Sequence, residues 1–362
     1  MDLISYTLED LKSNQFQAFS GNKEVAPLSP LRLQSYLKNP RADKRDHILF
    51  ELRHKDRLIA YRTLLPDCFY GHLGNSHRFA WLSGNYVDPE YRRRGYSTRL
   101  LQLAEEQWDG RLMYTNYAPV SKAVYDHTGQ FNVLFQKPGK RFYLRAASSE
   151  LLGKRMGNQK LLTTGDQLVN RLREGMLQKY QAVHPSQCLI ERINSFDQQM
   201  TEMISQSKKQ SLFRRDSKDF SWILDHPWVT ERGVEPLDYQ FSYKVERFEN
   251  LLWKFTLPGD KGLGLLWLEI HNRKMSAPYL FLNNEEIYPL MARTLIRLMI
   301  THGCAYSTVR NTKLVESLIQ HKKQFLSTRN MPQFYFSHKS LADQVPDNME
   351  IHDGDGDVVF TG

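Results

Sequence analysis

The segment VDPEYRRRGYSTRLL, Val87 to Leu101, places three consecutive arginines beside a single glycine. Apolar residues with helical spacing follow, so the segment predicts a loop that leads into the N-terminus of a helix. Such an N-terminus leaves backbone N–H groups unpaired and carries about half a positive charge, which favours phosphate. Glycine lets the loop turn its amides inward, and arginine side chains add charge-assisted hydrogen bonds. These residues therefore predict a pyrophosphate site.

The elements that must position this loop are strands. The patterns ILFELRH and RLIAYRTLL predict a hairpin, a polar loop follows, and FAWLSGNYV predicts a third strand; they cover residues 48–54, 57–65, 66–78 and 79–87. The apolar positions after Tyr96 predict a helix, and LMYTN predicts a fourth strand at 112–116. A brief helix closed by Gly129 and two short strands ending near Arg145 complete the first half. The arginine loop thus joins the third strand to its helix.

The spacing Arg92-x-x-Gly95-x-Ser97 resembles the R/Q-x-x-G-x-G/A signature of the GNAT (Gcn5-related N-acetyltransferase) superfamily. Val87-x-Pro89-x-Tyr91 resembles the usual lead-in of that family, and SKAVYDHTGQF (121–131) resembles its second motif. The resemblance covers about residues 45–145. Serine stands at 97, where the family prefers glycine or alanine, and its small size keeps the loop tight.

This resemblance implies that acetyl-CoA is a co-substrate and that its pyrophosphate lies on the loop. It implies a cofactor site formed by Tyr86, Val87, Arg92, Arg93, Arg94, Gly95, Tyr96, Ser97, Thr98 and Asn116. A backbone amide near Tyr86 and Val87 would hold the thioester oxygen. Tyr125 would be the general acid, because a phenol with a reference pKa of about 10 is protonated at neutral pH. The alternative for Tyr125 is an aromatic residue packed in the core.

The general base is not assigned. The third strand, FAWLSGNYV, contains no acid, and the nearest carboxylates lie in the loop beyond it. Weak candidates remain. Asp88 and Glu90 are the acids of that loop, and Ser83 or Asn85 could position a water. His72 or His77 of the preceding loop could reach over the site.

The second half repeats the order of strands and helices and resembles a degenerate second GNAT-like fold. At the corresponding helix start it has LNNEEIYP (282–289), where two acids would repel pyrophosphate, so we expect no coenzyme A site there. The predicted fold class is α/β (α+β), with tandem GNAT-like domains that each contain a mixed, mostly antiparallel sheet flanked by helices. Residues 1–150 form the coenzyme-binding catalytic domain, and residues 151–362 form a domain for acceptor binding or for interaction, including pairing in a homodimer.

Composition sets the limits of these predictions. A chain of 362 residues favours two domains, and 41% hydrophobic with 25% charged residues is typical of a soluble globular protein. The net charge of +9 suits nucleic acid, an acidic surface or a phosphorylated cofactor equally well. The three cysteines are far apart, so neither a disulfide framework nor a metal site is predicted, and a cytoplasmic location fits best. No membrane span is expected, and HDGDGD (352–357) predicts a polar turn rather than a calcium loop.

Three functions fit these observations. The first is an N-acetyltransferase that transfers the acetyl group of acetyl-CoA to a small-molecule amine or an amino sugar, with no nucleic acid involved. The second is an aminoacyltransferase of the Fem type, which would use an RNA-carried donor and no coenzyme A. The third is an acyl-CoA-binding sensor without catalytic activity. The intact arginine–glycine loop favours the first. Aromatic residues of the segment 217–228 are predicted to stack on the acceptor, or else to join the two halves.

Overall fold

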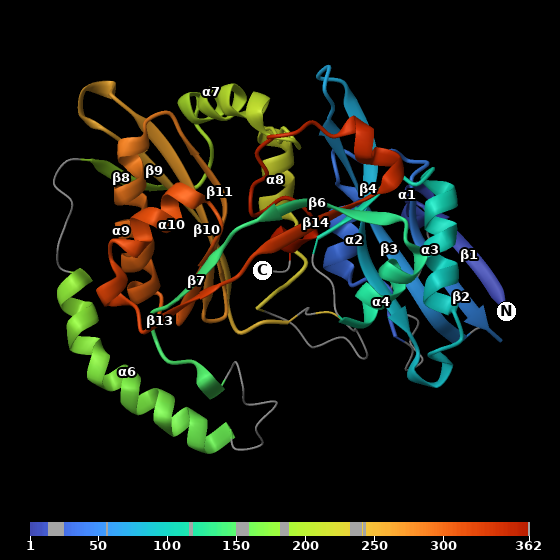
Figure 1. Cartoon of the computed structure of the whole chain (residues 1–362), viewed down its shortest axis with the longest axis horizontal. Helices are drawn as coiled ribbons and strands as arrows, with labels where there is room; N and C mark the ends of the chain where they lie inside the picture. The colour runs from blue at the N-terminus through green and yellow to red at the C-terminus, as the bar shows by residue number, and fades with distance from the viewer. Residues whose placement is uncertain are drawn as a thin grey trace. The chain divides into compact units, whose positions relative to one another are not determined.

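A computed structural model describes residues 1–13, 25–55, 57–115, 119–149, 159–181, 188–231, 241 and 244–360. It contains two seven-stranded mixed sheets with helices packed against them (Figure 1). The predicted fold class is confirmed in this respect. Two compact units are assembled from interleaved segments: residues 1–136, 205–245 and 334–361 form the first, and residues 137–204 and 246–333 form the second.

The first unit holds sheet A, whose strand order is β1-β2-β3-β4-β5-β14-β6. β4 and β5 are parallel, whereas the pairs β1–β2, β2–β3, β3–β4 and β5–β14 are antiparallel. The strands are β1 (Asp2–Thr7), β2 (His47–His54), β3 (Arg57–Tyr70), β4 (Ser76–Val87), β5 (Leu112–Tyr114), β14 (Gln333–His338) and β6 (Phe131–Lys137). The helices of this unit are α1 (Leu8–Lys12), α2 (Pro30–Leu37), α3 (Tyr96–Gln107), α4 (Pro119–Thr128) and α8 (Ser217–Asp225). Most of α7 (Gln198–Ser207) belongs to the second unit, and its residues from Ser205 on belong to the first.

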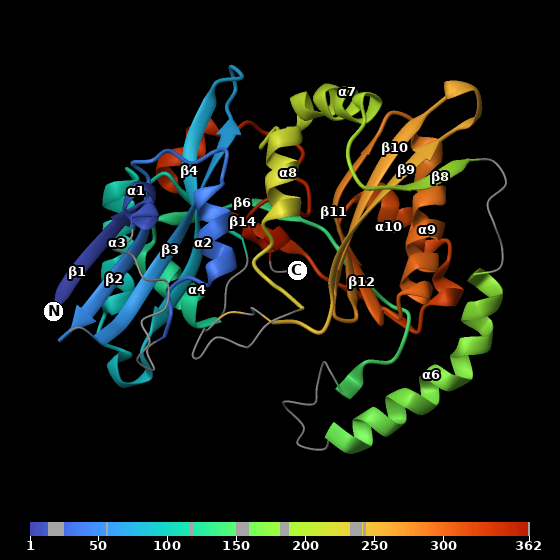
Figure 2. The ribbon, with the colours of Figure 1, turned by 180° about the vertical axis from the view of Figure 1, so that it is seen from behind.

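Opposite faces of sheet A carry different helices. α3 and α4 lie on one face and α2 lies on the other, as the two opposite views in Figures 1 and 2 show. Leu100, Leu101 and Ala104 of α3 recur at helical spacing and are fully buried against Leu64 and Leu82 of the sheet. Burial of each such leucine stabilises the fold by roughly 1.5–3 kcal/mol. This packing fixes the position at which α3 begins.

The second unit holds sheet B, whose strand order is β13-β7-β12-β11-β10-β9-β8. Only β11 and β12 are parallel among the pairs described in this sheet. The strands are β13 (Ser327–Asn330), β7 (Lys140–Tyr143), β12 (Tyr306–Val309), β11 (Lys274–Leu282), β10 (Leu263–His271), β9 (Phe248–Thr256) and β8 (Leu189–Ile193). Its helices are α6 (Gln159–Gln181), α9 (Tyr288–Thr301) and α10 (Thr312–Ile319).

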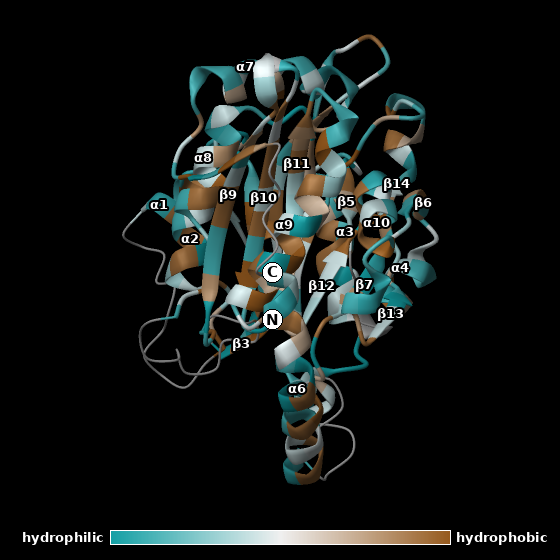
Figure 3. Cartoon of the chain, turned by 90° about the vertical axis from the view of Figure 1, so that its left-hand side faces the viewer, coloured by the Kyte–Doolittle hydropathy of each residue, from teal (hydrophilic) through white to brown (hydrophobic). Residues whose placement is uncertain are grey.

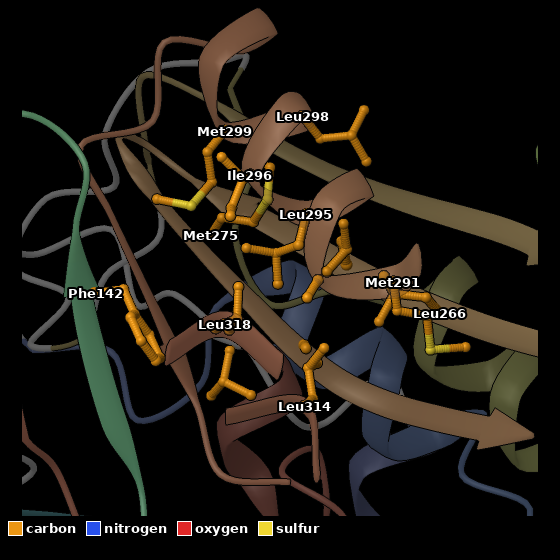
Figure 4. Close-up of a cluster of buried hydrophobic side chains, with 14 of the residues drawn as sticks. Phe142, Leu266, Met275, Met291, Leu295, Ile296, Leu298, Met299, Leu314 and Leu318 are labelled. Atoms are coloured by element: carbon orange, nitrogen blue, oxygen red, sulfur yellow. The ribbon is translucent and has the colours of Figure 1, made fainter. Parts of the chain in front are cut away.

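The core of the second unit lies between sheet B and α9 and α10. Met291, Leu295 and Met299 of α9 point into this core with Leu314 and Leu318 of α10, and all five are fully buried (Figure 4). Figure 3 shows the contrast with α6, which carries both hydrophobic and hydrophilic residues along its length. Its Leu161, Leu168 and Leu172 are exposed.

Each sheet contains one strand that comes from the other half of the sequence. β14 lies in sheet A between β5 and β6, and β7 lies in sheet B between β12 and β13. A chain cut near residue 150 would therefore lose β14, and it would also lose α8, which belongs to the first unit. The assignment of separate functions to residues 1–150 and 151–362 stays a prediction.

The loop predicted at 66–78 is wrong for most of its length. β3 continues to Tyr70 and β4 already begins at Ser76, so a long hairpin occupies most of this range. Pro66 is tolerated because β2 pairs with β3 only as far as Thr63, so the missing N–H removes no bond to β2. The N-terminal strand β1, which pairs antiparallel with β2, was not predicted.

Candidate functional site in the first unit

The free edge of β4 is the central feature of the site. β4 pairs with β5 in the described residues only at Ala80–Leu112 and Trp81–Met113. From Leu82 to Val87 the edge of β4 that faces β5 therefore has no β5 partner in the described part of the chain. Alternate N–H and C=O groups of this edge can bind an extended ligand as another strand would.

A β-bulge lies where β4 leaves β5. Thr63 of β3 pairs with Gly84, but the next residue, Leu64, pairs with Leu82, so Ser83 is an extra residue in β4. A bulge bends the strand and redirects a side chain, and bulges are frequent next to active sites. Ser83 points to the face of the sheet that carries α2, since its hydroxyl contacts Arg32. The bulge thus separates the paired part of β4 from its free edge.

The loop between β4 and α3 has the backbone that an anion site requires. Arg93 has φ +61° and Gly95 has φ +79°, both in the left-handed region. Gly95 is the N-cap of α3 and has no side chain to cap the helix, so the first amides of α3 are open to a ligand. Alternation of left-handed and other residues turns successive N–H groups to one side, which forms an anion nest. The loop predicted from the arginine–glycine spacing is therefore correctly located in the structure.

The arginine side chains of this loop are exposed. Arg92 Nε donates to the Val87 carbonyl at 3.1 Å, and Arg94 Nη2 donates to the Glu90 carbonyl at 3.2 Å. The Arg94 guanidinium also lies over the ring of Tyr91 at 5.3 Å. Each of these guanidiniums has further N–H donors available for an anion, because one guanidinium carries five. The contacts hold both arginines close to the N-terminus of α3.

Ser97 has a defined partner, which explains a serine at a position where glycine or alanine is usual. Asn85 Nδ2 donates to Ser97 Oγ at 2.9 Å, across from the strand to the first turn of the helix. This bond joins the free edge of β4 to α3. Thr98 is half-buried in the same turn, and Tyr96 packs near Tyr91 with 6.4 Å between ring centroids.

Tyr125 lies in the core on the α3 face of sheet A. Its ring stacks on Tyr114 with 4.3 Å between centroids, and 5% of its surface is exposed. Arg62 Nη1 donates to the Tyr125 hydroxyl at 3.2 Å. Arg62 is buried, and its Nε and Nη2 have no hydrogen-bond partner among the described residues. The role of Tyr125 as a general acid stays a prediction.

Two of the other predicted cofactor residues, Tyr86 and Val87, are the last residues of β4. Tyr86 stacks on Tyr61 of β3, with 5.5 Å between centroids, and is half-buried. Val87 packs against the core of the α3 face. Asn116, also predicted to contact the coenzyme, lies outside the described residues. The loop that follows Val87 is held by an ion pair between Arg57 Nη2 and Asp88 Oδ2 at 2.7 Å.

The aromatic residues predicted to stack on an acceptor are packed inside the first unit. Phe220, Trp222 and Trp228 are buried, and Trp222 Nε1 donates to the Ser35 carbonyl at 2.8 Å. Trp228 stacks on Phe360 with 4.9 Å between centroids. These three rings have no open faces for a sugar, and the prediction that they contact the acceptor is wrong for them. His226, the fourth residue of that prediction, is half-buried, and its contact with an acceptor stays a prediction. Phe220 and Trp222 lie on the short helix α8, and Trp228 follows that helix.

The C-terminal segment brings a carboxylate to the bulge, which the sequence did not predict. The Ser83 hydroxyl donates to Asp357 Oδ2 at 2.7 Å, and Arg32 Nη2 donates to Ser83 Oγ at 2.9 Å. Asp357 is half-buried. Burial raises the pKa of the Asp357 carboxyl, although the hydrogen bond from Ser83 and the charge of Arg32 act in the opposite direction. The only signal in the sequence was the acidic run HDGDGD.

A buried ion-pair network anchors this C-terminal segment. Arg215 Nε contacts Asp355 Oδ1 at 3.0 Å, and Arg215 Nη2 contacts Asp67 Oδ2 of β3 at 2.8 Å. Arg41 Nη1 also contacts Asp67, at 2.7 Å, and Trp81 Nε1 donates to it at 2.8 Å. Burial alone would raise the pKa of Asp67, but Arg215, Arg41 and the Trp81 bond outweigh it and lower the pKa.

The corresponding helix start in the second unit is built differently. The side chain of Asn284 caps the turn before α9 by accepting from the Glu286 amide, and Glu285 pairs with Lys313 at 3.0 Å. A Cβ atom placed on Gly264 of β10 would lie 2.9 Å from Ile287 and from Met291, so apolar side chains fill this position. That this unit binds no coenzyme A stays a prediction.

Within the described residues, no helix is long and apolar enough to cross a membrane. No group of three or more histidine, cysteine, aspartate or glutamate side chains in that part of the chain could hold a metal ion.

Comparisons with known proteins give one family match and several similar structures. Residues 8–125 match the Acetyltransferase (GNAT) family. N-myristoyltransferase from Saccharomyces cerevisiae with bound myristoyl-CoA is similar in structure, with a TM-score of 0.51, 11% identity, and coverage of 98% of this chain and 83% of that chain. A GCN5-related N-acetyltransferase from Kribbella flavida gives a TM-score of 0.44 and 13% identity, covering 92% of this chain and 71% of that one. No curated protein matches the sequence.

Residues 8–125 therefore form a GNAT acetyltransferase domain, and the resemblance stated from the arginine–glycine loop is confirmed. The likeness to N-myristoyltransferase is a likeness of fold alone, because only 11% of the residues are identical.

Proposed function

We propose that this protein is an N-acetyltransferase that transfers the acetyl group of acetyl-CoA to a small-molecule amine or an amino sugar. The observation that carries the proposal is the free edge of β4, which runs from the bulge at Ser83 to the open helix N-terminus at Gly95. The pyrophosphate binds the loop from Arg92 to Thr98, and the pantetheine arm lies along β4 as an additional strand would. This places the thioester on the free edge between Val87 and the bulge.

The chemical step needs three groups. An amine attacks the thioester carbon, an oxyanion develops on the carbonyl, and the departing thiolate takes a proton. A backbone amide of the free edge near Tyr86 binds the oxyanion, and Tyr125 protonates the thiolate. Arg62, which donates to the Tyr125 hydroxyl at 3.2 Å, positions the phenol.

The donor itself is testable by calorimetry. Acetyl-CoA, myristoyl-CoA and coenzyme A are titrated into the full chain, because a fold neighbour binds myristoyl-CoA and the acyl length has to be measured. We expect acetyl-CoA to bind, and coenzyme A to bind with similar affinity through the shared pyrophosphate. Release of free thiol from acetyl-CoA is then followed with polyamines, amino sugars and amino acids as acceptors.

Each alternative function has its own outcome in this experiment. An aminoacyltransferase of the Fem type would bind none of the three coenzyme forms. An acyl-CoA sensor would bind acetyl-CoA but release no thiol with any acceptor. Faster thiol release with one class of amine identifies both the activity and the acceptor class.

A further inference from the structure

The bulge in β4 and the C-terminal segment form a hydrogen-bonded chain of three side chains. Arg32 of α2 donates to Ser83 Oγ, and the Ser83 hydroxyl donates to Asp357 Oδ2, at 2.9 Å and 2.7 Å. Arg32 is held in turn by the Thr63 hydroxyl at 2.7 Å and by Tyr36 at 2.9 Å. All of these residues belong to the first unit. The chain ends at the bulge, beside the edge of β4 assigned to the thioester.

The Ser83 hydroxyl can offer one hydrogen-bonding position to a ligand. A hydroxyl has one donor and two acceptor lone pairs. Ser83 uses the donor for Asp357 and one lone pair for Arg32. The hydroxyl of Tyr36 is a third hydrogen-bonding neighbour, and its single proton can be donated to Thr63 instead of Ser83. Ser83 is half-buried, so the remaining lone pair can accept a hydrogen bond from a ligand N–H.

The two faces of sheet A separate this chain from Tyr125. Tyr125 packs in the cluster with Leu64, Leu82 and the residues of α3. Ser83 and Asp357 lie on the face that carries α2, as the contact with Arg32 shows. An amine that attacks the thioester from the α2 face would meet Ser83 and Asp357. A thiolate that leaves on the α3 face would meet Tyr125.

We propose that Asp357, acting through the hydroxyl of Ser83, accepts the proton that the attacking amine loses. This proposal rests on the acetyltransferase function proposed above and supplies the general base that the sequence left unassigned. The neutral amine nitrogen forms a bond to the carbonyl carbon as its N–H proton passes to Ser83 Oγ. The Ser83 proton passes to the Asp357 carboxylate. The C–S bond breaks, the thiolate takes the proton of Tyr125, and the products are the amide and coenzyme A with its free thiol.

The surroundings of Asp357 suit this task. A general base works best when its pKa lies near the working pH, and an ordinary aspartate has a pKa of about 3.9. Burial raises the pKa of the Asp357 carboxyl. The charged group facing it from α2 is Arg32, and β4 contributes the neutral hydroxyl of Ser83. The pKa is therefore shifted toward the range in which a carboxylate can take up a proton.

Asp357 is held in place by its neighbour in the HDGDGD segment. Asp355 is fully buried, accepts from the His352 amide at 2.7 Å and pairs with Arg215. Arg215 reaches Asp67 in β3, so the segment is fixed to the same sheet that carries the bulge. This anchoring lets a side chain near the end of the chain act at β4 with defined geometry.

The test compares two small nucleophiles, water and hydroxylamine, so it can be carried out before the natural acceptor is known. Water must lose a proton as it attacks, whereas hydroxylamine is a strong neutral nucleophile that attacks without prior deprotonation. Thiol release from acetyl-CoA is measured with each of them for the wild type, Asp357→Asn and Ser83→Ala. Asp347→Asn is the matched control, because Asp347 is exposed in the same C-terminal segment. Acetyl-CoA affinity and thermal unfolding are measured for every variant.

We expect Asp357→Asn to lower the hydrolysis rate by roughly 10²- to 10⁴-fold, the usual contribution of a general base. Its rate with hydroxylamine should fall less than tenfold, and its acetyl-CoA affinity should stay unchanged. The increase of the wild-type hydrolysis rate with pH should disappear in this variant. Ser83→Ala keeps the carboxylate and should lower hydrolysis by roughly tenfold, so it tests the proposal even if Asp357→Asn unfolds.

Three results would overturn the proposal. Hydrolysis of acetyl-CoA at the wild-type rate by both Asp357→Asn and Ser83→Ala would show that neither residue takes part in proton transfer. Equal losses with water and hydroxylamine would show a structural role. A wild type that binds acetyl-CoA but releases no thiol with water, hydroxylamine or any of the amine acceptors would refute the acetyltransferase function itself, whereas the first two results leave that function intact.

Discussion

Substitution of Gly95 tests what the loop backbone contributes to acetyl-CoA binding independently of the arginine side chains. Gly95 has φ +79°, and a Cβ atom added to it would meet no other atom within 4 Å. The cost of Gly95→Ala is therefore backbone strain alone, about 1–2 kcal/mol for a non-glycine residue in the left-handed region. If the loop relaxes to relieve this strain, its amides no longer converge on the pyrophosphate. The expected loss of acetyl-CoA affinity is then roughly five- to thirtyfold.

Gly303 provides the matched control. It follows α9 in the second unit with φ +68°, and a Cβ atom there also meets nothing within 4 Å. Gly303→Ala should lower the free energy of unfolding by the same amount as Gly95→Ala, but acetyl-CoA affinity should not change. Gly95→Asn should retain most of the affinity, because asparagine tolerates the left-handed region.

Isothermal calorimetry with acetyl-CoA and thermal unfolding of each variant are the measurements. The reasoning is refuted if Gly95→Ala loses stability as Gly303→Ala does and still binds acetyl-CoA with wild-type affinity. In that case the amides between β4 and α3 do not hold the pyrophosphate, whatever the arginines contribute.

Three further predictions follow from the site. Replacing Arg92 and Arg94 together by glutamine should cost roughly 2–4 kcal/mol of acetyl-CoA binding, and the wild-type affinity should fall with added salt; equal calorimetric affinities would contradict this. Tyr125→Phe should lower thiol release by about ten- to a thousandfold with acetyl-CoA affinity unchanged, and a fully active variant would leave Tyr125 a core residue only. Asp67→Asn should lower the free energy of unfolding by about 3–5 kcal/mol, because the buried guanidiniums of Arg41 and Arg215 each lose one of their two carboxylates. The pKa of Asp67 is lowered in the folded state, so its contribution is present above its unfolded value of about 3.9 and is lost as pH falls through the folded value; denaturant unfolding of the variant should lack this loss, and identical pH curves would contradict it.

Local features of the site could be predicted because contiguous residues encode them. The start of α3, the left-handed position of Gly95 and the arginines beside it depend on a few neighbouring residues. Helical spacing and turn residues carry that information directly. The family resemblance in the first half rests on the same local motifs. The long hairpin of β3 and β4 was not predicted. Its polar, glycine-containing sequence is typical of a loop, but pairing between the two strands keeps most of it extended.

Only the tertiary structure decided which distant segments meet. Ser83 and Asp357 are 274 residues apart, and nothing in HDGDGD indicates that its last aspartate reaches β4. The placement of β14 in sheet A and of β7 in sheet B depends on which strand edges are free when the sheets assemble. The entropic cost of closing a loop grows only slowly with loop length. A long separation in the sequence therefore does little to prevent two segments from pairing. Burial and edge pairing choose among them, and these are properties of the assembled sheets that no local pattern records.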